Sequence, residues 1–104
     1  MSEEKKNPEE KKNNPEEKYQ SLKEKLDQSH RWPSRYMFKF ICPNEEKTIE
    51  KVKEKFDSEK FEFRSKPSKT GKFISLTFVG EMKDSDEVIE KYKSLENIEG
   101  LIAL

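Results

Sequence analysis

The residues best suited to chemistry lie in one short segment, KPSKTGK at positions 66–72. Its three lysines, two hydroxyls and one glycine could hold a phosphate or a carboxylate. However, the segment lacks the GxxxxGK[ST] spacing of a phosphate-binding loop, and it leads into a strand rather than a helix. The alternative is a hairpin turn with Gly71 at a positive φ and lysines that keep the turn soluble. On the first interpretation, the ligand-binding candidates in and beside this hairpin are Lys39, Ser68, Lys69 and Ser75.

No other set of residues forms a catalytic or metal-binding pattern. His30 is the only histidine, and one histidine cannot build a metal site. Cys42 ends a strand-like segment and has no neighbouring cation in the sequence to activate its thiol. The serines have no companion histidine for nucleophilic catalysis. We therefore expect a protein that is not an enzyme and that uses no metal or other cofactor.

The composition predicts one tail and one small domain. Of the 104 residues, 42% are charged and 30% hydrophobic, and residues 2–18 contain no apolar side chain. Such a stretch cannot offset the entropy of ordering, so we expect Met1–Asn13 to be disordered. Tyr19, Leu22 and Leu26 then predict a helix over about 15–28, which either docks on a partner or packs on its own domain. The predicted division is a charged low-complexity tail at 1–31 and a domain at 32–104.

Charge and cysteine content limit the classes of partner and the compartment. Basic and acidic residues balance, at eight of each up to Arg31 and fourteen of each from Trp32 onward. The basic excess typical of a general nucleic-acid binder is therefore absent. One cysteine excludes an internal disulfide, the charged start does not resemble a signal peptide, and no apolar run could cross a bilayer. We expect a cytoplasmic protein without a membrane partner.

The elements that must position the hairpin follow the order β-α-β-β-α-β. We expect strands at 36–42, 61–66, 72–80 and 98–104, with helices after Asn44 and after Asp84. Asn44 is the expected cap of the first helix, and Asp84 with Glu87 fits a capping box for the second. This order predicts an α+β, ferredoxin-like sandwich, in which a four-stranded antiparallel sheet carries both helices on one face. The first and third strands should be central.

Alternation assigns the two faces of the predicted sheet. The more apolar set should lie under the helices: Phe38, Phe40, Ile74, Leu76 and Phe78. The opposite face then shows a mixture of apolar and charged side chains, unlike a face that meets only water. Its members are Met37, Lys39, Ile41, Glu62, Arg64, Phe73, Ser75, Thr77 and Val79. The last strand, GLIAL, has no side-chain charge to discourage pairing at a sheet edge. The candidate contact residues are Arg64, Phe73 and Leu101.

An RNA-binding domain of the same topology is the alternative. Such domains stack bases on aromatic side chains of the first and third strands. GKFISLTFV at 71–79 resembles their third-strand motif at Gly71 and Phe73. The second stacking position is Ser75, and the first strand offers Lys39 instead of an aromatic residue. One aromatic residue of three favours a protein partner over nucleic acid.

The segment from Trp32 to Leu104 resembles the YbeD-like domains of unknown function, DUF family number 493. The resemblance rests on WPSRYMFKFI, on SKPSKTGKFISLTF around the hairpin and on the final LIAL. Where many relatives have glycine after the first strand, this chain has Cys42 and Pro43. The resemblance implies a ferredoxin-like domain similar to the ACT-type regulatory modules of metabolic enzymes. The mixed open face, the uncharged last strand and the lysine-rich hairpin predict a binding or regulatory module, which associates with itself or with a protein partner and could bind a small anionic ligand.

Overall fold

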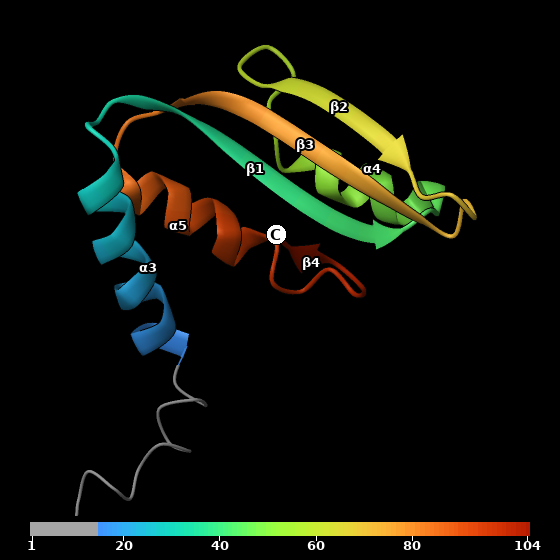
Figure 1. Ribbon diagram of the computed structural model, residues 1–104, viewed down its shortest axis with the longest axis horizontal. Helices are drawn as coiled ribbons and strands as arrows, with labels where there is room; N and C mark the ends of the chain where they lie inside the picture. Colours follow the sequence, from blue (N-terminus) through green and yellow to red (C-terminus); the bar gives the residue numbers. More distant parts are fainter. Residues whose placement is uncertain (1–14) are drawn as a thin grey trace, which may run out of the picture. The chain divides into compact units, whose positions relative to one another are not determined.

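The computed structural model describes residues 15–104, and the predicted disorder of Met1–Asn13 lies outside this range (Figure 1). The backbone divides into two units, one ending at Arg31 and one spanning Trp32–Leu104. In the first unit, helix α3 spans Pro15–Ser29 and overlaps the helix expected over about 15–28. Proline at its first position suits a helix start, because proline has no N–H group to leave unbonded there.

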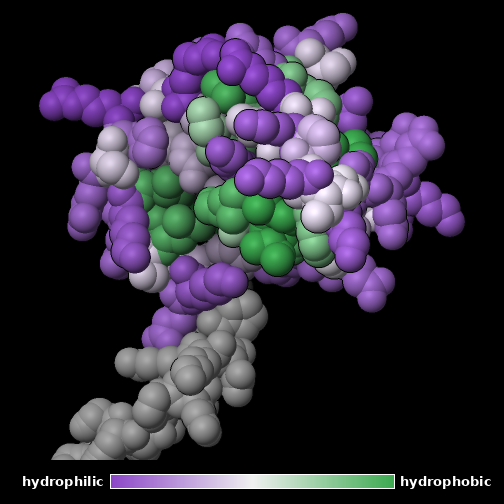
Figure 2. All heavy atoms as spheres, turned by 45° about the vertical axis from the view of Figure 1, so that its right-hand side comes forward, coloured by the Kyte–Doolittle hydropathy of each residue, from purple (hydrophilic) through white to green (hydrophobic). Residues whose placement is uncertain are grey.

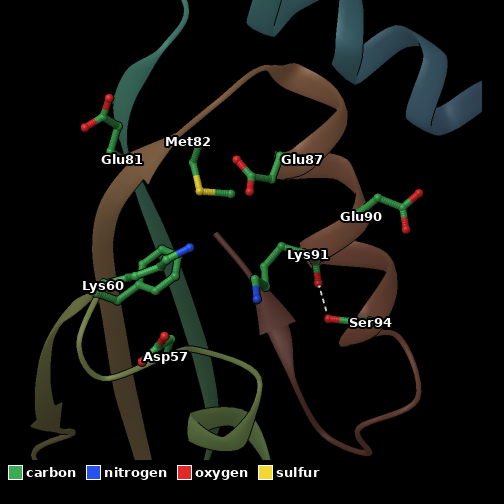
Figure 3. A pocket seen from close by; sticks show the side chains of 9 residues that line it. Asp57, Lys60, Glu81, Met82, Glu87, Glu90, Lys91 and Ser94 are labelled. Atoms are coloured by element: carbon green, nitrogen blue, oxygen red, sulfur yellow. Dashed lines mark hydrogen bonds between the residues drawn. The ribbon is translucent and has the colours of Figure 1, made fainter.

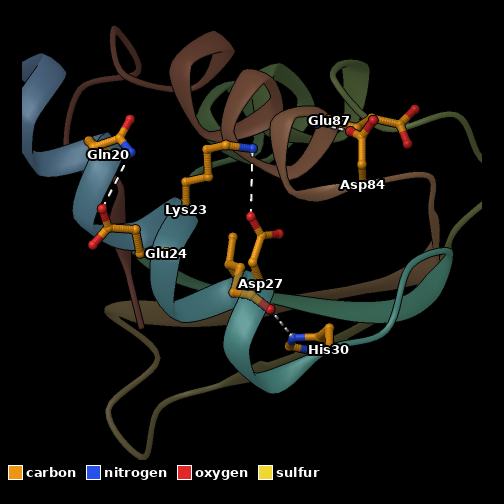
Figure 4. Close-up of polar contacts among 8 residues, drawn as sticks. Gln20, Lys23, Glu24, Asp27, His30, Asp84 and Glu87 are labelled. Carbon is orange, nitrogen blue, oxygen red and sulfur yellow. Dashed lines mark hydrogen bonds and ion pairs between the residues drawn. The ribbon is translucent and has the colours of Figure 1, made fainter.

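Polar contacts within α3 follow helical spacing (Figure 4). Lys23 Nζ lies 3.7 Å from an Asp27 carboxylate oxygen, one turn away. Just after the helix, His30 Nδ1 lies 3.3 Å from the carbonyl oxygen of Leu26, also four residues earlier. His30 therefore takes part in the end of the helix, as a local polar contact rather than a ligand site.

The second unit has the element order expected from the sequence. Strand β1 spans Ser34–Pro43, helix α4 Glu46–Glu54, β2 Glu62–Pro67, β3 Phe73–Met82, α5 Ser85–Ser94 and β4 Ile102–Ala103. The sheet order is β2-β3-β1-β4, and every neighbouring pair is antiparallel. Both helices lie against the same face of the sheet (Figure 1). The predicted ferredoxin-like α+β fold, with the first and third strands central, is confirmed.

The register of β1 and β3 sets which side chains become the core. Phe38 pairs with Phe78 and Phe40 with Leu76, and these four side chains are almost fully buried. Phe56, just beyond α4, stacks on Phe78 with ring centroids 3.9 Å apart. The predicted inner face is therefore confirmed, and much of its packing is between aromatic rings. From the helices, Val52, Val88, Ile89 and Leu95 complete this core.

One predicted helix cap is right and one is wrong. Asp84 precedes α5, and its Oδ1 accepts a hydrogen bond from the Glu87 N–H at 2.9 Å. Glu87 Oε1 accepts in return from the Lys83 N–H, one residue earlier than in the usual capping box. For α4, however, the residue at the cap position is Glu45, which makes no side-chain cap. Asn44 instead donates from Nδ2 to the Gly71 carbonyl at 3.0 Å, so it binds the β2–β3 loop.

The last strand is shorter than expected. The sequence predicts a strand over 98–104, but only Ile102 and Ala103 pair with β1. The preceding residues form a turn, in which Gly100 has a φ of +81° and the Leu101 N–H donates to the Ile98 carbonyl at 3.3 Å. A positive φ is unfavourable for residues with a Cβ, and the turn keeps this stretch out of the ladder.

Replacing Asp84 by alanine removes the side-chain acceptor at the start of α5. We expect Asp84→Ala to lower the free energy of unfolding by about 1 kcal/mol, because a backbone N–H loses its partner. Asp84→Asn keeps an acceptor oxygen and should lose less. Urea unfolding followed by circular dichroism measures both variants, and equal losses would contradict the capping role.

Candidate binding surface on the open sheet face

The face of the sheet opposite the helices, called the open face below, carries exposed apolar side chains. Met37 is 57% exposed, Phe73 50%, Ile102 59% and Leu104 63%. Met37 pairs with Val79 in the ladder, and Ile41 pairs with both Ser75 and Ile102, so these side chains share one face. Hydrophobic side chains also gather among charged ones on the molecular face drawn in Figure 2. The open-face residues predicted from alternation are confirmed, and β4 adds Ile102 and, beyond its last residue, Leu104.

Positive charge gathers in the middle of the open face. Lys39 and Arg64 both pair with Thr77, from opposite sides of β3, and Lys66 pairs with Ser75 in the adjacent row. None of these three cations has an ion-pair partner within residues 15–104. Toward the start of β1, Arg35 lies 3.6 Å from the Glu62 carboxylate. The centre of the face therefore presents uncompensated cations beside exposed aliphatic side chains.

The four ligand-binding candidates do not form one cluster. Lys39 and Ser75 lie in adjacent rows of the open face, and Ser75 Oγ donates to the Lys66 carbonyl at 3.3 Å. Ser68 lies beyond the end of β2, where its N–H donates to the Phe73 carbonyl. Ser68 bonds to Phe73, whereas Lys39 pairs with Thr77, and these two residues of β3 are four positions or about 13 Å apart. Lys39 and Ser75 therefore share a surface, whereas Ser68 and Lys69 belong to the loop.

Hydroxyl groups in the loop bond to its own backbone. Ser68 Oγ accepts from the Phe73 N–H at 3.2 Å, and Thr70 Oγ1 accepts from the Lys72 N–H at 3.4 Å. Gly71 has a φ of +78°, as the turn interpretation expects. These contacts favour the hairpin turn over an anion site, because the hydroxyls already serve the turn. Sequence patterns could not show that Asn44 would also bind this loop.

Of the contact candidates, Phe73 and Arg64 lie on the open face and are exposed. Leu101 instead lies in the turn before β4 and is only partly exposed. Ile102 and Leu104 take the place that the sequence assigned to Leu101. Alternation within GLIAL could have predicted Ile102 and Leu104 together, because every second side chain faces the same way. The sequence did not show which of the two alternating sets faces outward, because that depends on the register of β4 against β1.

A pocket on the helical side was not expected from the sequence. It measures about 290 Å³ and lies between α5, the end of β3 and the loop before β2. Lys60, Lys91, Glu87 and Met82 point into it, and Glu90 points away (Figure 3). Burial lowers the pKa of Lys91, whose Nζ donates to the Lys55 carbonyl and lies 5.0 Å from the Phe56 ring centroid. The two lysines of this pocket come from different elements of the fold, so no local sequence motif predicts the pocket.

Two further titratable groups serve the core. Tyr92 and Tyr36 share a hydrogen bond between their hydroxyls at 3.1 Å. Burial, and then this bond, raise the pKa of Tyr92 above its ordinary value. Burial also raises the pKa of the Cys42 thiol, whose side chain is fully enclosed. Within residues 15–104, no three side chains of the metal-binding types lie together, and no helix is long and apolar enough to cross a membrane.

Comparison with known proteins identifies the family. A family model described as "Protein of unknown function (DUF493)" matches residues 27–104. The chain belongs to this family. A similar fold is found in the solved structure of the uncharacterized protein TM1266 from Thermotoga maritima, with a TM-score of 0.56 and 19% sequence identity over 67% of this chain and 90% of that one. At this identity the likeness shows the fold alone. Among curated proteins there is no significant match.

The enclosure of Cys42 predicts low thiol reactivity. Only the thiolate reacts rapidly, and the buried group has both a raised pKa and no access to reagent. We expect the native chain to react with a chromogenic disulfide reagent at neutral pH at least about a hundredfold more slowly than the chain in urea. Equal rates in the two conditions would contradict this enclosure.

Proposed function

We propose that this protein is a non-enzymatic binding module, which holds a protein partner on the open face of its sheet. The observation that supports this proposal is a combination on one face of exposed apolar side chains with cations that have no ion-pair partner within residues 15–104. The apolar side chains are Met37, Phe73, Ile102 and Leu104. A sheet face that meets only water usually carries polar side chains in alternation. Here, four large apolar side chains stay at least half exposed, which is typical of an interaction surface.

Burial of these side chains supplies the driving force. Each buried Å² of apolar surface contributes roughly 25 cal/mol, so covering several half-exposed side chains favours association. Lys39, Arg64 and Lys66 then select the partner and its orientation by charge. The covered helical face cannot serve in the same way, because its apolar residues already form the core.

Single-stranded RNA is the second candidate for the same face. The unpaired cations would attract phosphates, and Phe73 could stack on one base. However, Met37, Ile41, Val79 and Ile102 are aliphatic, and bases stack on aromatic rings. The face therefore suits apolar side chains of a protein better than a row of bases.

Regulation is the role that we propose for such binding. The resemblance to ACT-type modules supports it, since those domains control the enzymes to which they are attached. A small anion bound near Lys39 and Ser75 remains a second element of this proposal. We also propose the cytoplasm as the compartment, because a single buried thiol suits reducing conditions.

Introducing a carboxylate on the open face tests the proposal. We expect Phe73→Glu to reduce capture of the native partner from cell extract at least tenfold, because the partner would then have to cover a hydrated carboxylate in place of an apolar ring. Ser58→Glu adds the same charge in the exposed loop after α4 and should not change capture. Circular dichroism checks that both variants stay folded. Capture that survives Phe73→Glu would reject the face, and capture abolished by ribonuclease would favour RNA.

Self-association is tested separately by sedimentation. If a second copy covers the open face, the full chain will sediment as a dimer at high micromolar concentration. Ile102→Glu should return it to a monomer, because two carboxylates would then meet in the interface. A wild-type chain that stays monomeric throughout this range leaves a different protein as the partner.

A further inference from the structure

The β4 side of strand β1 is only partly paired. All ten residues of β1 pair with β3, but only Phe40 and Ile41 pair with β4. Leu104 extends this contact, since its N–H donates to the Lys39 carbonyl at 2.8 Å. Within Trp32–Leu104, no strand lies beside Ser34–Phe38 on this side of the sheet (Figure 1). We call this unpaired stretch the open β1 edge.

Backbone alternation shows which groups point along the open β1 edge. The bond to Leu104 means that the N–H and C=O of Lys39 point away from β3. Because this direction repeats every second residue, the backbone groups of Arg35 and Met37 point the same way. The backbone N–H and C=O groups of Tyr36 and Phe38 point toward β3 instead, where these residues pair with Gly80 and Phe78. Arg35 and Met37 thus offer two N–H donors and two C=O acceptors to which a further strand could bond.

The two outer edges of the sheet differ in how they discourage pairing. Along β2, Glu62, Arg64, Lys66 and Pro67 are all exposed, and charges and proline are the usual protection of an edge. The open β1 edge has Arg35 and the half-exposed Met37, and β4 beside it carries no charge. Arg35 is already paired with Glu62 across the face. The open β1 edge is therefore the less protected of the two.

We propose that the open β1 edge receives an extended segment of a partner protein, which adds to the sheet as a strand in line with β4. This inference rests on the proposed function and names how the partner is held. The stretch from Ser34 to Phe38 gives room for a segment of about five residues, or about 17 Å. Main-chain hydrogen bonds to Arg35 and Met37 supply affinity, and side chains on the two faces supply selectivity.

The chemistry of the segment follows from its neighbours. On the open face it lies beside Met37 and Leu104, which are largely exposed and apolar, so its side chain there is apolar. On the opposite face it lies beside Tyr36 and the buried Phe38, which also favours apolar residues. One end of the segment lies near Lys39 on the same face, which has no ion-pair partner within residues 15–104. The segment is therefore apolar and β-forming, with carboxylates toward one end.

Amide hydrogen exchange tests strand addition directly. The probe is the acetylated and amidated peptide Val-Leu-Val-Glu-Thr-Glu, added to the full chain at neutral pH. Without peptide, we expect the amides of Arg35 and Met37 to exchange rapidly and those of Tyr36 and Phe38 slowly. The peptide should slow Arg35 and Met37 at least about tenfold, since both N–H groups become bonded. Two matched peptides, one with lysine for glutamate and one N-methylated at leucine, should protect them less.

Three outcomes overturn the proposal. Exchange at Arg35 and Met37 that is unchanged by millimolar peptide shows that no strand adds. Protection of both amides in the free chain at low concentration shows that the chain fills its own edge. Protection that appears only as the protein concentration rises assigns the edge to a second copy, and not to a different protein.

The same readout separates this inference from the proposed function. Suppose that the native partner binds the wild-type chain but not Phe73→Glu, and that the amides of Arg35 and Met37 still exchange rapidly in the wild-type complex. This result would support binding to the open face and reject strand addition. A partner that protects both amides and still binds Phe73→Glu keeps the edge and rejects the open face.

Discussion

Pairing of β1 with β3 in a single register is the constraint on which the rest of this structure depends. It places Phe38 against Phe78 and Phe40 against Leu76 beneath the helices, and it places Met37 and Lys39 on the other side. Side chains alternate strictly, so a slip by one residue would exchange the two sets. Phe38 and Phe40 would then meet water, and Lys39 would be buried. Burial of the four core side chains thus stabilises this register, and the register determines which side chains lie on the open face.

Sequence patterns predicted the parts of the fold that have this strict periodicity. The buried face followed from alternation in FKF and ISLTFV, the strand order followed from the β-α-β-β-α-β succession of elements, and the cap at Asp84 followed from its spacing to Glu87. Features set by contacts distant in sequence could not be predicted. Asn44 has the side chain of a helix cap, but the Gly71 carbonyl is close enough to bind it instead. The turn at Gly100 shortens β4 and replaces Leu101 by Ile102 and Leu104 on the open face.

The candidate site divides in the same way. Lys39, Arg64, Phe73 and Ser75 could be placed on one surface because each lies on a strand of known phase. Ser68 and Lys69 are in a loop, and the hydroxyl groups of this loop bond to its own backbone. Alternation along a strand therefore could not place these two residues. The pocket around Lys91 depends on how α5 packs beside the loop before β2, and no local pattern in the sequence encodes that arrangement. Membership in the DUF493 family names no function, and the similar solved structure supports only the fold.

The most direct measurement of the central claim is the accessibility of individual methyl groups to a soluble paramagnetic probe. The account predicts strong broadening of the methyl signals of Met37, Ile102 and Leu104, and sharp signals from Leu76, whose side chain is enclosed between the sheet and the helices. Broadening of Leu76 with protection of Met37 would show that the two faces of the sheet are exchanged. The open face, and the binding proposed for it, would then be wrong.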